Sequence, residues 1–234
     1  MSTTAVMRPI CAAILPLTRM LPGRGPACWC FTKGSGGEFA MERARRLAGL
    51  GYVALAADMF GDRRQATSLQ EVATLVGGLR AEPEKLRARG RAALETLAAL
   101  PQVDAGRMAA IGFCFGGSVV LELAREGAEL KAVVSFHGVL TTKMPAQPGQ
   151  VKASVLVCTG VDDPLAPPDQ VADFENEMRT GGVKDWQVIA YGNTLHGFTN
   201  PAADGSMMRT ALYNEQADRR SWASMKSLFD EVLT

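Results

Sequence analysis

From Glu38 to the end, the chain alternates amphipathic helical patterns with short, continuous apolar runs. Helical spacing covers 39–50, 84–100, 116–125, 169–180 and 217–232, and apolar runs cover 52–57, 107–111, 131–136, 154–159 and 186–191. Short apolar runs that alternate with helices are typical of parallel strands buried on both faces. We therefore predict an α/β fold with a mostly parallel central sheet and helices on both faces. The stretch 61–81 is expected to be a loop with a helix that overhangs a site.

The composition fits one domain over residues 1–234 and argues against several classes of partner. Hydrophobic residues make up 47% of the 234 residues, which is enough for a full core. The net charge of +1, with both signs evenly mixed, gives no electrostatic reason to expect binding to nucleic acid or to an anionic membrane. A small molecule is the expected partner, and the chain is expected to be a monomer or a weak dimer.

The cysteines and the apolar segments indicate in which cellular compartment the protein is expected. Five cysteines at irregular positions do not suggest a disulfide framework, and reduced thiols indicate a cytoplasmic protein. No apolar stretch reaches the ~18 residues of a membrane span, and Pro9 and Pro16 interrupt any signal-peptide pattern. Cys28 and Cys30 have no partner pair at metal-ligand spacing, so a metal site is not expected.

A cysteine lies between glycines where a predicted strand meets a predicted helix. The residues are Gly112-Phe113-Cys114-Phe115-Gly116-Gly117. Glycines permit a turn too tight for side chains and leave the central residue exposed, as in the G-x-S-x-G nucleophile elbow, with sulfur here in place of oxygen. Cys114 is therefore predicted to be a nucleophile that attacks an acyl carbon. A buried structural cysteine is the alternative.

The candidates for a catalytic base are the two histidines of the chain. A cysteine nucleophile needs a base because the thiolate attacks and a free thiol is mostly protonated near neutral pH. His196 follows the predicted strand 186–191, where a loop can bring it over the strand ends, whereas His137 is expected to be structural. Asp162 and Asp163 follow another predicted strand, and either can orient the imidazole or cap a turn. Nucleophile, then acid, then histidine is the order that α/β-hydrolases use, with all three at the carboxyl ends of parallel strands.

Three short motifs carry a resemblance to a known family. Cys114 lies in G-x-C-x-G-G, Asp163 and Pro167 fit D-x-x-x-P, and His196 begins H-x-F. Together they resemble the dienelactone hydrolase family, which implies the α/β-hydrolase fold and favours the second of the two aspartates as the acid. The segment 51–61 is also similar to the family's G-Y-x-x-x-x-P-D-x-[YF]-G, with alanine in place of the proline.

The resemblance implies a chemistry and an oxyanion hole. It implies a hydrolase that cleaves a small ester or lactone through the cysteine, histidine and aspartate triad and a thioester intermediate, without a cofactor. The oxyanion of the tetrahedral intermediate is expected to meet the Phe115 N–H and a second amide near Lys33 or Gly34.

The residues expected to contact the substrate are Phe60 and Asn200. Family members that act on dienelactone bind its carboxylate through arginines, one of them four residues after the catalytic histidine, where this chain has Asn200. A broader esterase or lactonase specificity therefore stays open. Arg63, Arg64 and Arg80 lie in the overhanging segment and are available for a cationic contact, although solvated surface positions are expected. Solvated positions are also expected for three arginines of the first helix, Arg43, Arg45 and Arg46.

The resemblance extends from about Glu38 to the C-terminus, and the chain before it departs from the family pattern. A hydrolase of this type has an apolar strand here that ends in an oxyanion-hole loop, whereas residues 26–34 read Pro-Ala-Cys-Trp-Cys-Phe-Thr-Lys-Gly. Codons for that string, read two bases later, accommodate Val-Leu-Val-Phe-His-Glu-Gly, which resembles the family's strand and loop. We hypothesise that residues 1–33 are an out-of-frame translation, which sequencing of the gene would test. A divergent N-terminus is the alternative.

Two other functional classes stay open. A noncatalytic α/β-hydrolase-fold protein, which binds a ligand or is inactive, would keep the core and lack a working oxyanion hole. A redox-sensing protein would use an exposed cysteine of low pKa. The triad residues favour the hydrolase over both.

Overall fold

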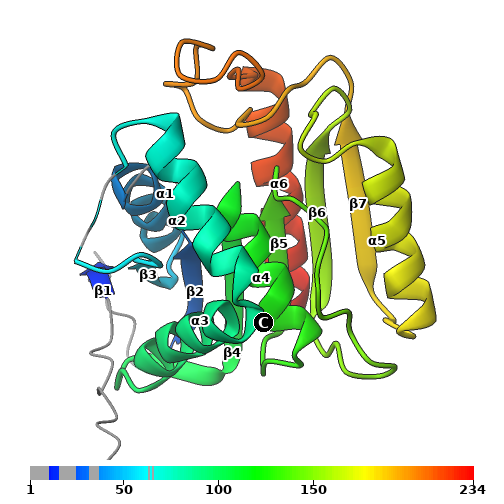
Figure 1. Ribbon diagram of the computed structural model, residues 1–234. Helices are drawn as coiled ribbons and strands as arrows, with labels where there is room; N and C mark the ends of the chain where they lie inside the picture. The colour runs from blue at the N-terminus through cyan, green and yellow to red at the C-terminus, as the bar shows by residue number, and fades with distance from the viewer. Residues whose placement is uncertain (1–10, 16–24, 32–36, 63, 65) are drawn as a thin grey trace, which may run out of the picture.

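A seven-stranded sheet forms the centre of the structure (Figure 1). The computed structural model describes residues 11–15, 25–31, 37–62, 64 and 66–234. The strands are β1 (Cys11–Leu15), β2 (Gly25–Phe31), β3 (Val53–Ala57), β4 (Val103–Phe113), β5 (Ala132–Phe136), β6 (Ser154–Gly160) and β7 (Trp186–Tyr191). They lie in the order β1-β3-β2-β4-β5-β6-β7, and every neighbouring pair is parallel except β1 with β3. The predicted α/β fold with a mostly parallel sheet is confirmed.

Each parallel strand except β5 is followed by one or more helices. They are α1 (Gly37–Gly49), α2 (Leu69–Ala81), α3 (Pro83–Ala98), α4 (Phe115–Arg125), α5 (Pro168–Thr180) and α6 (Glu215–Val232). All the predicted helices and strands form, and α2 is the helix expected within 61–81. The largest difference is β4, which starts before the predicted 107–111 because Val103 pairs with Gly25 of β2. None of the helices in the described ranges is long and apolar enough to cross a membrane.

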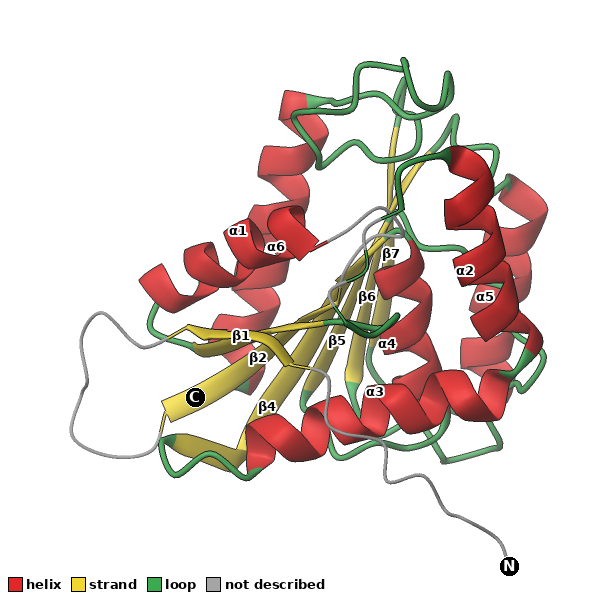
Figure 2. Cartoon of the chain, turned by 60° about the vertical axis from the view of Figure 1, so that its left-hand side comes forward, coloured by secondary structure: helices red, strands yellow, loops and turns green. Residues whose placement is uncertain are grey.

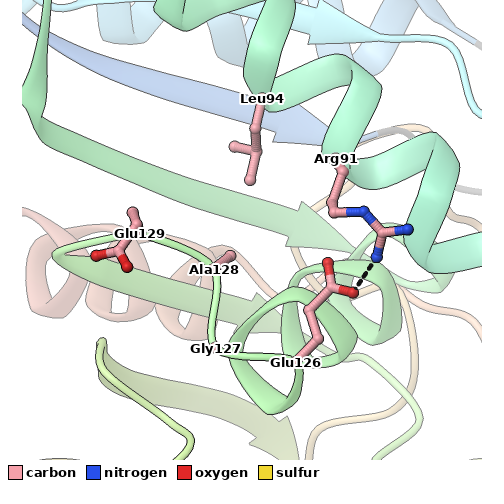
Figure 3. Close-up of a pocket in the computed structure, with 6 residues that line it drawn as sticks. All are labelled: Arg91, Leu94, Glu126, Gly127, Ala128 and Glu129. Carbon is pink, nitrogen blue, oxygen red and sulfur yellow. Dashed lines mark hydrogen bonds and ion pairs between the residues drawn. The ribbon is translucent and has the colours of Figure 1, made fainter.

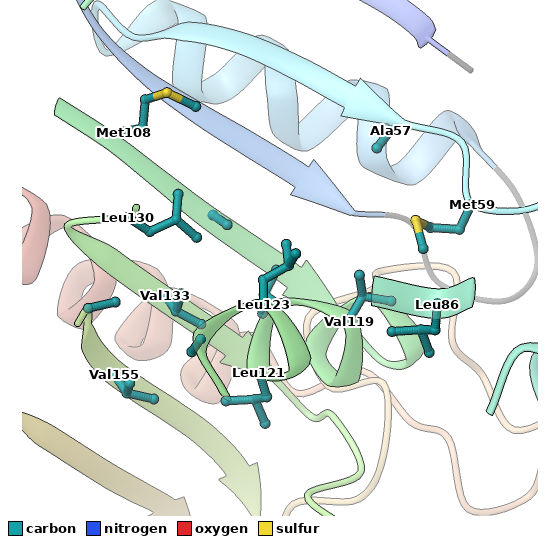
Figure 4. Close-up of a cluster of buried hydrophobic side chains, with 14 of the residues drawn as sticks. Ala57, Met59, Leu86, Met108, Val119, Leu121, Leu123, Leu130, Val133 and Val155 are labelled. Atoms are coloured by element: carbon teal, nitrogen blue, oxygen red, sulfur yellow. The ribbon is translucent and has the colours of Figure 1, made fainter. Parts of the chain in front are cut away.

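The helices cover both faces of the sheet (Figure 2). On one face, α1 and α6 bury side chains that include Leu47 and Phe229. On the other face, α3, α4 and α5 form a second cluster with α2 beside them; Figure 4 shows part of it, including Leu121 of α4 and Val133 of β5. Because both faces are buried, the strands are apolar along their length, as parallel strands are.

The strand β2 corrects the expectation that the family's apolar strand is absent before Glu38. It lies between β3 and β4 and is parallel to both. Ala27, Cys28 and Cys30 are fully buried in it. Alanine and cysteine are small and among the residue types most often buried, so a strand paired on both sides can accept them in place of valine and leucine. The hypothesis that residues 1–33 are an out-of-frame translation concerns the gene and stays a prediction.

Arg43 of α1 is buried, which corrects the expectation of a solvated position; Arg45 and Arg46 are exposed, as predicted. Position 43 falls on the apolar stripe of the helix, three residues after Ala40, so its side chain faces the core. Its guanidinium contacts Asp218 of α6 at 3.1 Å and donates a hydrogen bond to the Thr199 carbonyl. It also lies over three aromatic rings, those of Phe39 at 4.9 Å, Phe113 at 5.6 Å and Trp222 at 5.5 Å.

A second buried charge network ties α3, α4 and α5 to the loop after β5. Arg87 of α3 and Arg125 of α4 contact Glu122 at 2.7 and 3.0 Å, and Arg125 also contacts Glu177 of α5 at 2.8 Å. Both arginines donate to backbone carbonyl groups of that loop. Removing Glu122 would leave the buried Arg87 without its carboxylate partner, so this residue is central to the network that holds the loop.

Candidate active site

Cys114 occupies the turn between β4 and α4. Its backbone is left-handed, with a φ of 54°, which residues other than glycine seldom adopt. Flanking glycines make the turn possible: a Cβ at Gly112 would lie 1.9 Å from the Gly116 carbonyl oxygen, and one at Gly117 would lie 2.6 Å from Ser135 Oγ. The predicted strand-to-helix turn is present. Backbone strain of this kind is concentrated at functional sites.

His196 and Asp163 meet on the loops that follow β7 and β6. The distance from His196 Nδ1 to Asp163 Oδ2 is 2.8 Å, and both residues are buried, with 3% and 2% of their surfaces exposed. Asp163 Oδ1 accepts the Leu165 N–H, which fixes the carboxylate. Asp162, the other candidate, is exposed. Because the carboxylate accepts a hydrogen bond from Nδ1–H, Nε2 carries a lone pair when the imidazole is neutral and a proton when it is charged.

The thiol of Cys114 and the imidazole of His196 influence each other electrostatically. His196 lowers the pKa of the Cys114 thiol through its charge and through a side-chain hydrogen bond, and Nε2 has no other well-aligned partner among the described residues. Apo forms of enzymes commonly show catalytic contacts that tighten only when substrate binds. Nε2 is therefore buried and available for proton transfer.

The pKa values of this pair favour the thiolate–imidazolium form. Burial opposes ionisation of Cys114, but the charge of His196, the Phe115 N–H and the charge of Arg80 outweigh it, so the pKa of the thiol lies below its ordinary value. Burial also opposes ionisation of His196, but the Cys114 thiolate and Asp163 raise the pKa of the imidazole to about 10. A thiolate is the nucleophilic form of cysteine, so this environment activates it.

The thiols within the sheet contrast with Cys114. Burial raises the pKa values of Cys28 and Cys30 well above their usual range, and it raises the pKa of Cys158 to about 12. Thiols of this kind remain protonated and react slowly. Among the cysteines whose side chains the structure describes, Cys114 alone combines partial exposure with a lowered pKa.

Phe115 and Phe60 lie beside the nucleophile. Phe115 is the first residue of α4, and its N–H approaches the Cys114 sulfur, whose pKa it lowers. A free amide at a helix N-terminus is suited to bind an oxyanion. The ring of Phe60 stacks on the Phe115 ring, with centroids 5.6 Å apart. Asp58 Oδ1 accepts the Phe60 N–H at 2.9 Å, which fixes the turn that presents the ring.

The predicted roles of Asn200, Lys33 and Gly34 stay predictions. Asn200 lies in the histidine loop, and its side-chain oxygen accepts the Ala202 N–H at 3.3 Å, a contact within its own turn. Lys33 and Gly34, the expected source of the second oxyanion-hole amide, fall outside the described residues.

The sequence predicts a solvated position for Arg80, but the structure makes it a candidate site residue. It is half-buried on α2, its guanidinium donates to Ser118 Oγ at 3.2 Å, and it lies 6.0 Å from the centre of the Phe115 ring. Arg64, by contrast, is exposed and pairs with Glu71 at 3.1 Å, as a surface arginine would. The helical pattern of α2 carries no signal that its last turn folds back over the nucleophile turn.

His137 is also closer to the site than expected. It follows β5, and its ring centroid lies 5.0 Å from that of His196. The sequence predicts a structural role for His137, because the residue follows a strand and belongs to no motif. Such a position does not reveal which loops meet beside it.

A cavity of about 330 Å³ lies away from this site (Figure 3). It is lined by Arg91, Leu94, Glu126, Gly127, Ala128 and Glu129. Arg91 and Leu94 belong to α3 and residues 126–129 directly follow the C-terminal end of α4, whereas Cys114 precedes the N-terminal end of α4. The cavity is therefore at the opposite end of that helix from the nucleophile turn.

Comparisons with known proteins give a consistent result. A family model described as the dienelactone hydrolase family matches residues 22–233, so the resemblance reaches further toward the N-terminus than Glu38. A solved structure named m3DLH is 46% identical, with a TM-score of 0.86 over 92% of this chain and 89% of that one. A dienelactone hydrolase-like promiscuous phosphotriesterase from metagenomic libraries is 42% identical, with a TM-score of 0.84 over 91% and 88%. An uncharacterized protein of Caenorhabditis elegans is 34% identical over 151 residues, which are 63% of this chain and 94% of that protein.

Proposed function

The chain belongs to the dienelactone hydrolase family and is a carboxylic-ester hydrolase, and we propose that it cleaves small esters or lactones with Cys114 as the nucleophile. In this proposal His196 is the general base and acid, and Asp163 orients its imidazole. The observation that carries the proposal is a thiol of lowered pKa on a strained strand-to-helix turn, beside an imidazole that a buried carboxylate contacts at 2.8 Å.

The first half of the reaction forms a thioester. The Cys114 thiolate attacks the carbonyl carbon, and the carbonyl oxygen becomes an oxyanion near the Phe115 N–H. The imidazolium of His196 then gives its Nε2 proton to the leaving oxygen, and the carbon–oxygen bond breaks. An ester releases its alcohol at this step, whereas the alcohol of a lactone stays attached to the acyl group.

The second half releases the acid. Neutral His196 takes a proton from a water molecule, the resulting hydroxide attacks the thioester, and the carbon–sulfur bond breaks to restore the thiolate and imidazolium. Asp163 keeps the Nδ1 proton in place in both halves, so that Nε2 faces the reacting atoms.

The test of this proposal is inactivation by alkylation near neutral pH. Iodoacetamide should modify Cys114 and stop the hydrolysis of p-nitrophenyl acetate in proportion to the fraction modified, because this thiol has a lowered pKa. Cys28, Cys30 and Cys158 should stay unmodified, since burial raises their pKa values. Peptide mass spectrometry measures the modification and p-nitrophenolate release measures turnover. Turnover that persists after complete alkylation of Cys114 contradicts the proposal, and alkylation of a protein without turnover favours the noncatalytic alternative.

Arg80 gives a prediction about both the thiolate and the substrate. Arg80→Met should raise the pKa of Cys114, because the nearby positive charge lowers it. It should also reduce kcat/KM by about tenfold for an ester whose acyl group carries a carboxylate, while p-nitrophenyl acetate is affected less. The pH dependence of Cys114 alkylation and the two hydrolysis rates measure these effects. Arg64→Met, an exposed arginine from the same segment, is the matched control; equal losses in both variants would exclude a specific role for Arg80.

A further inference from the structure

His137 connects the nucleophile turn to the histidine loop. Its Nδ1 lies 3.1 Å from the backbone nitrogen of Cys114, and its Nε2 lies 2.8 Å from Thr199 Oγ1. His137 and Thr199 are buried, with 2% and 0% of their surfaces exposed. The two ring nitrogens therefore reach two segments that the chain places far apart, one before α4 and the other just after His196.

The partners of the ring define its protonation. The Cys114 N–H can only donate, so Nδ1 of His137 must present a lone pair. The proton of a neutral imidazole then lies on Nε2, which donates to the hydroxyl of Thr199. The same Cys114 N–H also donates to the Phe136 carbonyl at 3.0 Å, so the amide is fixed from two sides.

Thr199, which His137 contacts through Nε2, is itself held by a further hydrogen bond. The Thr199 carbonyl accepts a hydrogen bond from the guanidinium of Arg43, which contacts Asp218 of α6. The His137 ring also makes T-shaped contacts with the rings of His196 and Phe198, with centroids 5.0 and 5.1 Å away. His137 thus touches the residue that presents the nucleophile, the proposed base and the loop that carries that base.

We propose that His137 is a positioning residue that sets the Cys114 turn against the His196 loop through its two hydrogen bonds. The inference rests on the proposed function, because it assigns His137 a part in aligning the proposed nucleophile and base. The two residues joined by the hydrogen bond from the Cys114 N–H to His137 Nδ1 both have strained backbones, with φ of 54° at Cys114 and 41° at His137. Residues persist in such conformations only where their surroundings hold them, and the bond from the Cys114 N–H to Nδ1 joins the two.

Two substitutions break the hydrogen bond between His137 and Thr199 and keep the bond to Cys114. Asparagine at 137 offers an oxygen near the place of Nδ1 and cannot reach Thr199, so His137→Asn keeps the Cys114 anchor alone. Thr199→Val removes the hydroxyl and keeps the shape, so it breaks the same bond from the other side. Thr199→Ser keeps the hydroxyl and is the matched control.

The expected result is a coupled loss in kcat. His137→Asn and Thr199→Val should each reduce kcat for p-nitrophenyl acetate by about tenfold, the effect of losing one neutral hydrogen bond, with KM unchanged. The double variant should lose no more than either single one, since both remove one interaction. Thr199→Ser should retain wild-type kcat. Circular dichroism melts establish that each variant is folded at the assay temperature.

Several outcomes overturn this inference. Unchanged kcat in both single variants excludes it, as does a double variant whose losses multiply, because His137 and Thr199 would then act separately. A change confined to KM would make His137 a substrate contact instead. If the wild-type protein has no turnover, the proposed function fails while the inference is still decided by the rate of Cys114 alkylation by iodoacetamide. That rate should fall in His137→Asn and Thr199→Val and stay unchanged in Thr199→Ser, and equal rates in all of them would refute the positioning role.

Discussion

Replacing Cys114 with alanine is expected to reduce kcat for p-nitrophenyl acetate by on the order of 10⁴-fold or more, because the variant has no atom that can form the covalent intermediate. The loss should appear in kcat rather than in KM, since the thiol bonds to the substrate only during the reaction. Steady-state kinetics on purified protein measure it. The protein should remain folded, because the Cys114 side chain is only partly buried and the flanking glycines that permit the turn are unchanged.

The matched control is Cys158→Ala. This cysteine lies in β6, is buried, and has a raised pKa, so it offers no thiolate near neutral pH. Its loss should leave kcat within about twofold of the wild-type value. Wild-type activity in Cys114→Ala would move the nucleophile to another residue and remove the basis of the proposed mechanism.

Replacing Asp163 with asparagine is expected to reduce kcat by on the order of 10³–10⁴-fold. The amide has nearly the same shape but lacks the charge that helps to hold His196 protonated, and it permits the tautomer in which Nε2 carries the only proton. Burial lowers the pKa of His196, and the thiolate and Asp163 together raise it to about 10. Without Asp163 that pKa should fall, so the alkaline limb of the pH–rate profile should move to lower pH.

Asp162→Asn separates this effect from a general change of charge in the loop. Asp162 is adjacent in sequence and exposed, whereas Asp163 contacts the imidazole. The control should keep nearly all of the activity, because an exposed carboxylate contributes little to a buried pair. If both variants lost activity equally, the loop as a whole rather than the Asp163 carboxylate would support turnover.

The strands and helices from Glu38 onward could be predicted because each carries a pattern that the finished fold does not override, whereas β1 and β2 were not predicted. The run 186–191 is predicted and found as β7 with the same bounds. The order of Cys114, Asp163 and His196 along the chain predicts that their loops meet, since parallel strands bring their carboxyl ends to one edge, and the structure places His196 Nδ1 2.8 Å from Asp163 Oδ2. The choice between two adjacent aspartates came from the family motif, and no pattern in the loop itself distinguished them.

The features that could not be predicted depend on tertiary contacts. Arg43 carries a charge on an apolar stripe, and its burial is explained by the surrounding aromatic rings, by Asp218 and Glu42, and by the Thr199 carbonyl. Arg80 and His137 lie beside Cys114 because α2 folds back and because two loops converge, and neither fact leaves a local signal. The strand β2 was missed because its alanine and cysteine residues are weaker strand signals than the valine and leucine that the family pattern led us to expect.

The contact between Arg43 and Asp218 has a consequence for any attempt to shorten this protein. The helix α6 is the last element of the chain, yet it neutralises the guanidinium that holds the Thr199 carbonyl in the histidine loop. Trimming away α6 would remove Asp218 and leave the buried guanidinium with the half-exposed Glu42, 3.2 Å from Nε, as its ion-pair partner, so the hold on the backbone that follows His196 would weaken. A shortened form of the protein is therefore expected to need the chain through Val232 for full stability of the histidine loop, although the proposed reaction uses no residue of that final helix.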